Sequence, residues 1–304
     1  MNAAARCRER PLILPCEGDH LLAVLSEPEG QNTGDLGVVI VVGGPQYRAG
    51  SHRLFVQLAR MLASAGFPVL RFDVRGMGDA TGTLRDFECI TPDIGAAIDG
   101  LCTANPNLRR IVLWGLCDGA SAALMYLGDR ADPRVSALAL VNPWVRTVGT
   151  QARARLKHYY LRRMFSGDFW RKALGGRVGL GAARELLGTA RAAGRGAADT
   201  PAPNHGRPGT ASHAERMTRC ASRLDLPVLL QMSGSDHTAR EFDEYTAASP
   251  AWQRLLLARS TLRADFPEAD HTFSSASPLQ QSLQGTLRWI QGLEPEPPSL
   301  RATR

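Results

Sequence analysis

The chain has 304 residues, of which 44% are hydrophobic and 6% aromatic, and it carries a formal net charge of +7. This length supports one large hydrophobic core, or one core interrupted by an inserted segment. No stretch approaches the roughly 18 consecutive apolar residues of a membrane span, and the charged N-terminus lacks the apolar run of a secretory signal. We therefore expect a cytoplasmic protein.

The positive charge is concentrated in one segment. Residues 146–195 hold twelve Lys or Arg against two acidic residues, Asp168 and Glu185, which leaves 24 basic and 27 acidic residues elsewhere. Because the rest of the chain is slightly acidic and no nucleic-acid-binding motif accompanies the basic segment, we predict no nucleic-acid partner.

The cysteines show no pattern of a disulfide framework or a metal site. None of them forms a CxxC pair, and none has a His or Cys neighbour at a ligand-like interval. We therefore expect reduced thiols and no bound metal. The six are Cys7, Cys16, Cys89, Cys102, Cys117 and Cys220.

The first 145 residues alternate short apolar runs with longer amphipathic segments, which is typical of an α/β sheet. Strands are predicted at residues 12–15, 21–25, 38–42, 69–72, 111–114 and 135–141. Helices are predicted at residues 52–65, 91–103 and 118–127. We expect the first two strands to form an antiparallel edge hairpin, and the fully apolar run at 38–42 to be a buried central strand.

The pattern then changes. Residues 146–222 are basic and helical in propensity, with a Gly-, Ala- and Pro-rich stretch at about 194–213 that predicts a flexible loop. Beyond it, strands are predicted at 228–232 and 262–266, and helices at 239–247 and 279–292. We therefore predict an α/β core formed by residues 1–145 and 223–293, with a mostly parallel eight-stranded sheet flanked by helices. The segment 146–222 is a helical cap after the sixth strand, and 294–304 is a disordered tail.

One strand-to-helix junction has a pattern typical of covalent catalysis. The sequence Gly115-Leu116-Cys117-Asp118-Gly119 follows an apolar strand and precedes a helix. Small residues at both glycine positions allow the sharp turn that holds a nucleophile clear of the sheet. The N–H groups and dipole at the start of the helix favour a thiolate. Cys117 is therefore the predicted nucleophile, and the alternative is an ordinary turn with a buried cysteine.

An acid and a base follow in the chain order that this pattern requires. Asp236 lies in a Gly-x-Asp turn after the strand predicted at 228–232, and His271 follows the next predicted strand. Asp236 would orient the imidazole ring of His271, and His271 would take the proton of the nucleophile. Asp270 is an alternative acid, whereas His237 is interpreted as a loop residue.

Two backbone N–H groups are expected to bind the oxyanion of the transition state. The first belongs to Asp118, whose side chain is suited to capping the helix or tuning its charge. The second belongs to the loop at residues 43–47. Because Pro45 in this loop has no N–H, Gln46 is the candidate donor. Each such donor contributes about 2.7–4 kcal/mol to transition-state stabilisation.

Further residues lie near the predicted site. Gly44 and Tyr47 in the oxyanion loop are candidates to contact the substrate. So is His52, for which the alternative is a role at the start of the following helix. Asp73 and Arg75, in an Asp-x-Arg-Gly turn after the fourth strand, are interpreted as residues that hold loops together.

Four short motifs resemble those of a known family. They are GGPQYRAGSHR at residues 43–53, DVRGMGD at 73–79, GLCD at 115–118 and DHTF at 270–273. With YYLRR and FWRK in the basic segment, they are similar to the type 1 hydrolases associated with the exosortase A system. The resemblance implies the α/β-hydrolase fold, with a cap after strand 6, and a bacterial protein linked to exopolysaccharide production and protein sorting. It implies no particular substrate.

The predicted reaction is hydrolysis of an ester or thioester through an acyl-enzyme on Cys117. Two alternatives are open, an acyltransferase in which an alcohol replaces water and a non-catalytic partner protein. We expect a small-molecule or carrier-bound acyl substrate and no cofactor. The basic cap could steer an anionic substrate, contact a membrane surface, or be an ordinary solvated face. The oligomeric state is not indicated.

Overall fold

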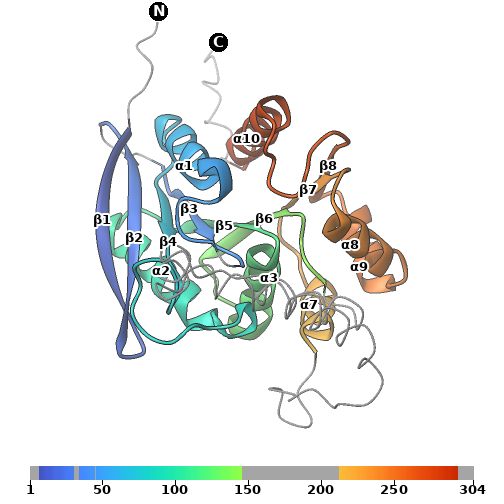
Figure 1. Cartoon of the computed structure of the whole chain (residues 1–304), viewed down its shortest axis with the longest axis horizontal. Helices are drawn as coiled ribbons and strands as arrows, with labels where there is room; N and C mark the ends of the chain where they lie inside the picture. Colours follow the sequence, from blue (N-terminus) through green and yellow to red (C-terminus); the bar gives the residue numbers. More distant parts are fainter. Residues whose placement is uncertain (1–6, 31–33, 45, 146–211, 294–304) are drawn as a thin grey trace, which may run out of the picture. The chain divides into compact units, whose positions relative to one another are not determined.

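A computed structural model describes residues 7–30, 34–44, 46–145 and 212–293 (Figure 1). The strands are β1 (Cys7–Cys16), β2 (Asp19–Pro28), β3 (Leu36–Val41), β4 (Val69–Phe72), β5 (Arg110–Leu116), β6 (Val135–Val141), β7 (Val228–Ser233) and β8 (Thr261–Phe266). The α-helices are α1 (Leu54–Ser64), α2 (Thr91–Ala104), α3 (Asp118–Arg130), α7 (His213–Ala221), α8 (His237–Ala247), α9 (Pro250–Leu257) and α10 (Ala276–Gln291). Two short 3-10 helices are η1 (Ser51–Arg53) and η2 (Phe87–Cys89).

The strands form one sheet in the order β1-β2-β4-β3-β5-β6-β7-β8. β1 and β2 form an antiparallel hairpin at one edge, and β2 also pairs antiparallel with β4. All neighbouring strands in the part of the sheet that runs β4-β3-β5-β6-β7-β8 are parallel. The carboxyl ends of these strands therefore lie at the same end of the sheet. In open α/β sheets the loops at this end build the binding site. The predicted mostly parallel, eight-stranded sheet with its edge hairpin is confirmed.

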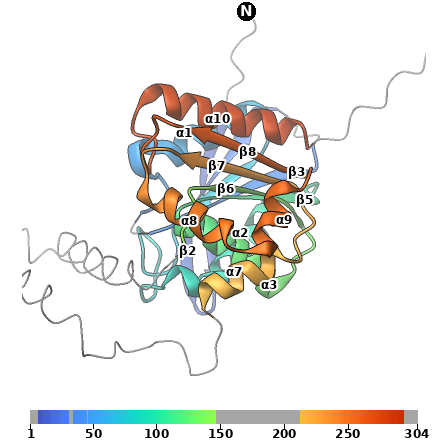
Figure 2. The same ribbon diagram turned by 90° about the vertical axis from the view of Figure 1, so that its right-hand side faces the viewer.

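Helices cover both faces of the sheet (Figures 1 and 2). In β3, Val39 and Val41 pack with side chains of α2 and α3, whereas Val38 and Ile40 pack with those of α1 and α10. All six residues of β3 are buried, which explains the uninterrupted apolar sequence of this strand. Each fully buried valine or isoleucine contributes about 1.5–3 kcal/mol. This packing on two faces fixes the strand ends from which the site is built.

α3 lies directly behind the candidate nucleophile. Its residues 118–126 are all buried. Glycine and alanine in its first turns allow the helix axis to come close to β5 and β6. At its other end, a Cβ on Gly128 would lie 3.2 Å from Cys220 of α7, so a small residue is needed there as well. Small side chains thus seat α3 close to the end of β5.

Three elements, β1, β2 and α9, differ from the predicted ones. β1 and β2 have ten residues each and are longer than predicted. α9 was not predicted, and its Trp252 packs edge-on against Phe242 of α8, with 5.1 Å between ring centroids. The predicted cap, up to residue 211, and the predicted tail at 294–304 lie outside the described residues. In the parts of the chain that are described, no helix has the length and apolarity to cross a bilayer.

Candidate active site

Cys117 occupies a strained turn between β5 and α3. Its φ of 61° and ψ of −127° are rare for a residue with a side chain, and such a conformation costs about 1–3 kcal/mol unless its surroundings hold it. Its N–H donates to the carbonyl of Val141 at 2.9 Å, and its own carbonyl accepts from Ala120 at 3.1 Å. The side chain is partly exposed. The thiol is therefore presented at the N-terminus of α3 by a backbone that is fixed on both sides.

The two glycines around Cys117 are required by close contacts. A Cβ on Gly115 would lie 2.6 Å from the nitrogen of Ala120, and one on Gly119 would lie 2.5 Å from the carbonyl oxygen of Val41. Both distances are below those of real side chains, and backbone atoms cannot rotate away. The predicted reason for glycine at both positions is confirmed by this geometry.

Backbone hydrogen bonds connect the loops that follow β5, β6, β7 and β8. Beyond the Cys117–Val141 bond, the N–H of Asn142 donates to the carbonyl of Gln231 at 2.9 Å. The N–H of Ser235 donates to the carbonyl of Ala269 at 3.0 Å. The ladder of the sheet thus continues past the strand ends. The segments that carry Cys117, Asp236 and His271 leave the same end of the sheet, after β5, β7 and β8.

Asp236 and His271 form a hydrogen-bonded pair. His271 Nδ1 lies 2.6 Å from Asp236 Oδ2, and the Asp236 side chain is only 5% exposed. Asp236 also caps α8, because its carboxylate accepts the N–H groups of Thr238 and Ala239 at 2.9 and 3.3 Å. Burial alone would raise the pKa of Asp236, but the hydrogen bonds from His271 and the backbone lower it overall. An ionised carboxylate is thus held against Nδ1, which leaves Nε2 for proton transfer.

Asp270, the alternative acid, has a different set of partners. Its carboxylate accepts the N–H groups of Thr272 at 3.2 Å and Ser274 at 2.8 Å, as well as the Ser274 hydroxyl. The Ser274 hydroxyl is the main reason why the pKa of Asp270 is lowered. Within the same turn, Phe273 has a left-handed φ of 54°. Asp270 therefore shapes the loop that carries His271. His237 is the exposed first residue of α8.

The predicted oxyanion loop packs against the first turn of α3. A Cβ on Gly43 would lie 2.2 Å from both Asp118 Oδ1 and the nitrogen of Gly119. The carboxylate of Asp118 is buried at this contact, and both of its oxygens lie 3.6 Å from the Cβ position of Gly44, whose φ is 60°. The loop backbone thus packs directly against the first turn of the helix, where Gly43 has no room for a side chain of its own. Pro45 lies outside the described residues.

The other predicted residues, Gln46, Tyr47 and His52, lie in the part of the chain that leads from this loop to α1. The side-chain oxygen of Gln46 accepts the N–H of Ser51 at 3.2 Å, which closes the loop on itself. Tyr47 is 51% exposed, and its ring lies 5.8 Å from the guanidinium of Arg48. His52 is exposed and left-handed, with a φ of 52°. The donation of the Gln46 N–H to an oxyanion, and substrate contacts by Gly44, Tyr47 and His52, stay predictions.

Buried charges hold the loops beside the site. Asp73 accepts the N–H of Arg48 at 2.7 Å and forms an ion pair with its guanidinium, which joins the oxyanion loop to the end of β4. Arg75, only 1% exposed, forms an ion pair with Asp93 of α2 at 2.8 Å and with Glu17 at 2.6 Å. Asp73 and Arg75 therefore have the structural role predicted for them. Their partners Arg48 and Asp93 were not predicted, because these ion pairs join residues that are distant in the sequence.

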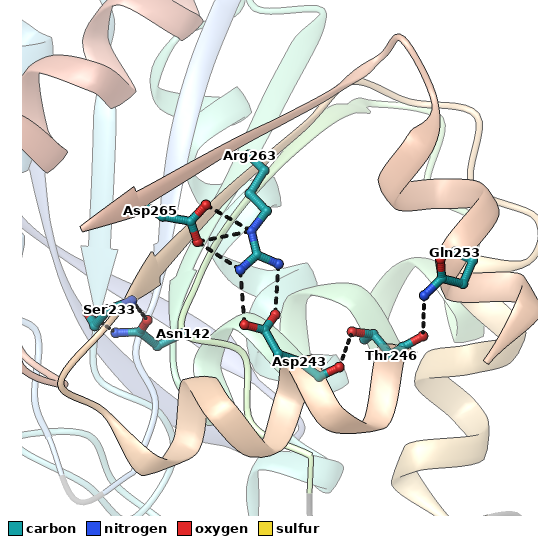
Figure 3. A network of polar contacts seen from close by, with 7 residues as sticks. All are labelled: Asn142, Ser233, Asp243, Thr246, Gln253, Arg263 and Asp265. Atoms are coloured by element: carbon teal, nitrogen blue, oxygen red, sulfur yellow. Dashed lines mark hydrogen bonds and ion pairs between the residues drawn. The ribbon is translucent and has the colours of Figure 1, made fainter. Parts of the chain in front are cut away.

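A second set of charges joins α8 to β8. Arg263 of β8 forms ion pairs at 2.7 Å with both Asp243 of α8 and Asp265 of its own strand (Figure 3). α8 begins just after Asp236, and β8 leads to His271. The contact thus joins the helix that begins after Asp236 to the strand that precedes His271. Among the described residues, no cluster of three His, Cys, Asp or Glu could hold a metal ion.

Asn142 is a residue of this region that the sequence analysis missed. It follows β6, is fully buried, and has a left-handed φ of 44°. Its side-chain amide contacts Ser233 at the end of β7 (Figure 3). It also donates to the backbone carbonyl of His271. The available signal was a lone amide directly after a buried strand and before a proline.

Comparison with known proteins supports the fold. Residues 36–168 match the family profile of serine aminopeptidase S33. The chain is 30% identical to Protein ABHD12B of Homo sapiens over 122 residues, 36% of this chain and 31% of that protein. It spans about a third of the length of the curated relatives it matches.

Solved structures resemble nearly the whole chain. The esterase Pf2001 of Pyrococcus furiosus has a TM-score of 0.61 at 14% identity, covering 94% of this chain and 93% of that one. Est1E of Butyrivibrio proteoclasticus, with ferulic acid bound, has a TM-score of 0.59 at 14% identity, covering 92% and 98%. These likenesses show the α/β-hydrolase fold.

Proposed function

We propose that this protein, which has the α/β-hydrolase fold, cleaves an ester or thioester through an acyl-enzyme on Cys117. The observation that carries the proposal is the 2.6 Å contact between His271 Nδ1 and Asp236, at the same end of the sheet as the strained Cys117 turn. An imidazole oriented by a buried carboxylate acts as a general base. A thiol at a helix N-terminus is a nucleophile suited to such a base.

The reaction has two acyl-transfer steps. His271 takes the proton of the Cys117 thiol as Sγ bonds to the substrate carbonyl carbon. The oxyanion accepts hydrogen bonds from the N–H of Asp118 and from a second donor in the oxyanion loop, for which Gln46 is the candidate. Collapse breaks the bond to the leaving alkoxide or thiolate, which receives the proton from His271. Water then adds to the thioester with His271 again as base, and a carboxylic acid and the free thiol are released.

The nucleophile favours activated acyl groups. When an amide is attacked, Cys117 leaves the tetrahedral intermediate more readily than the amine does, because a thiolate is the weaker base. A thioester or an aryl ester offers a leaving group of basicity similar to or lower than that of the Cys117 thiolate, so it can compete with Cys117. The structural similarity to the esterase Pf2001 supports this substrate class.

A finer proposal connects the reaction with bacterial exopolysaccharide production or protein sorting. Its support is the resemblance of residues 43–53 and 115–118 to the type 1 hydrolases associated with the exosortase A system. Both motifs lie at the candidate site, one in the oxyanion loop and one around the nucleophile. The acyl group would then belong to a small molecule or a carrier of that system.

The experiment is a panel of p-nitrophenyl esters and acyl thioesters with three proteins. These are the wild type, Cys117→Ala, and Cys89→Ala as a matched control that removes an exposed cysteine of η2. We expect Cys117→Ala to lower kcat/KM by about three or more orders of magnitude, and Cys89→Ala to leave it within about twofold. Intact-mass measurement should detect an acyl adduct on the wild type and Cys89→Ala. Equal turnover by wild type and Cys117→Ala would show that the proposed nucleophile is wrong.

A further inference from the structure

We propose that Asn142 is a positioning residue that fixes the backbone of His271. The inference rests on the proposed function, because it concerns the geometry of the proposed base. Asn142 takes no part in the steps written above. It acts through His271, and its three side-chain hydrogen bonds carry the inference.

The amide of Asn142 connects two neighbouring loops. Its Oδ1 accepts the N–H of Ser233 at 2.8 Å, and its Nδ2 donates to the Ser233 hydroxyl at 2.8 Å. The same Nδ2 donates to the carbonyl oxygen of His271 at 3.1 Å. Figure 3 shows Asn142 and Ser233 facing each other across the ends of β6 and β7. A single buried side chain therefore ties the end of β7 to the residue that carries the base.

Asparagine suits this position for two reasons. The side chain must accept one hydrogen bond and donate two, and among residues of this length only an amide does both. Aspartate could accept from Ser233, but an ionised carboxylate could not donate to the His271 carbonyl. The backbone φ of 44° also favours asparagine, which adopts left-handed conformations several-fold more readily than most residues.

The arrangement holds His271 at both ends. Asp236 fixes the ring through Nδ1, and Asn142 fixes the backbone through the carbonyl. Asn142 also follows Val141, whose carbonyl accepts the N–H of Cys117. The base is therefore positioned relative to the nucleophile through the end of β6, one of the two strands that lie between β5 and β8. A misplacement of about 1 Å in a reacting group can lower the rate about 100-fold.

The experiment compares Asn142→Gly and Asn142→Asp with Gln231→Leu. Glycine adopts the left-handed conformation without strain, so Asn142→Gly removes only the side-chain bonds. Gln231 is a matched control, because its equally buried amide makes three hydrogen bonds to Ser282 and Thr286 of α10 and none to His271. The readouts are kcat and KM for p-nitrophenyl butyrate between pH 5 and 9, the rate of Cys117 alkylation by iodoacetamide over the same range, and Tm.

We expect both Asn142 variants to lower kcat about 10- to 100-fold with KM changed less than about threefold. The pH dependence of Cys117 alkylation in these variants should differ from that of the wild type. Gln231→Leu should lower Tm but leave the pH dependence of both kcat and alkylation unchanged. If Cys117→Ala is inactive but Asn142→Gly behaves like Gln231→Leu, the proposed function stands and this inference is wrong. If Asn142→Asp keeps full kcat, the bond to the His271 carbonyl is dispensable and the inference is also wrong. If Cys117→Ala stays active, both fail together.

Discussion

Replacement of Gly43 by alanine gives a direct test of the oxyanion loop. Gly43 is buried where this loop meets the first turn of α3. Its added Cβ would lie 2.2 Å from Asp118 Oδ1 and from the nitrogen of Gly119. The nitrogen of Gly119 belongs to the backbone of the turn that carries Cys117, so it cannot rotate away from the added Cβ.

The size of the required movement follows from this contact. Ordinary van der Waals contact begins near 3.4 Å, so the loop and the helix start must separate by about 1.2 Å. Overpacking of this kind destabilises a fold by about 1–3 kcal/mol. The effect on catalysis should be larger, since loss of one oxyanion donor lowers kcat about 10²- to 10³-fold. We therefore expect Gly43→Ala to remain folded at 25 °C and to lose about two to three orders of magnitude in kcat.

The assay is steady-state hydrolysis of p-nitrophenyl butyrate with Tm measured in parallel. The matched control is Gly95→Ala in α2, where an added Cβ meets nothing closer than 3.8 Å. Alanine should stabilise that helix by about 0.5–1 kcal/mol and leave kcat unchanged. A folded Gly43→Ala protein with kcat within about threefold of wild type would refute the assignment of this loop to the oxyanion.

Two further predictions concern buried carboxylates. Asp236→Asn keeps an oxygen that can cap α8 but removes the negative charge beside the His271 ring. We therefore expect kcat at pH 7 to fall by about two to four orders of magnitude with little change in Tm. An unchanged pH–rate profile would contradict the role of the pair. The guanidinium of Arg134 and the hydroxyl of Tyr126 lower the pKa of Asp132 to about 2, despite partial burial. Because the pKa of Asp132 is lower in the folded than in the unfolded state, the ionised carboxylate stabilises the fold. This contribution is full above about pH 4 and is lost as the pH falls towards 2. Asp132→Asn should therefore lower the urea-unfolding free energy at pH 6 by about 1–2 kcal/mol and much less at pH 2.5; an equal loss at both would refute the linkage.

The sequence predicts elements well where apolar periodicity dominates. The buried strand β3 and the turn at Cys117 are visible because their apolar residues and glycines are local signals. β1 is longer than predicted because charged residues begin it. Glu9 in that part lies beside Arg60 and Arg71, and although burial would raise its pKa, hydrogen bonds from both arginines lower it to about 2. Such a charged strand end is recognisable only once its distant partners are known.

The candidate site shows the same difference between residues with a local sequence signal and residues whose partners are distant in the chain. Cys117, Asp236 and His271 are predicted because each lies in a short motif and the three follow a fixed order. Asn142 has no such signal, since its partners are 91 and 129 residues away in the chain. Similarly, the contact of Gly43 with α3 depends on the packing of two loops. Interactions that position the predicted residues are thus long-range, and they appear only in the folded chain.

The distribution of backbone strain connects these positioning contacts with the proposed chemistry. Seven non-glycine residues in the described parts of the chain have a left-handed φ. Two of them, Glu17 and Ala131, lie in a hairpin turn and at a helix end. The other five are His52, Arg53, Cys117, Asn142 and Phe273, and they belong to the loops of the candidate site. Each such residue costs free energy and persists only where neighbouring contacts over-determine it. The hydrogen bonds of Cys117, the amide of Asn142 and the carboxylate of Asp270 supply such contacts at three of the five. The strained residues are therefore concentrated in the segments that carry the proposed nucleophile and the proposed base.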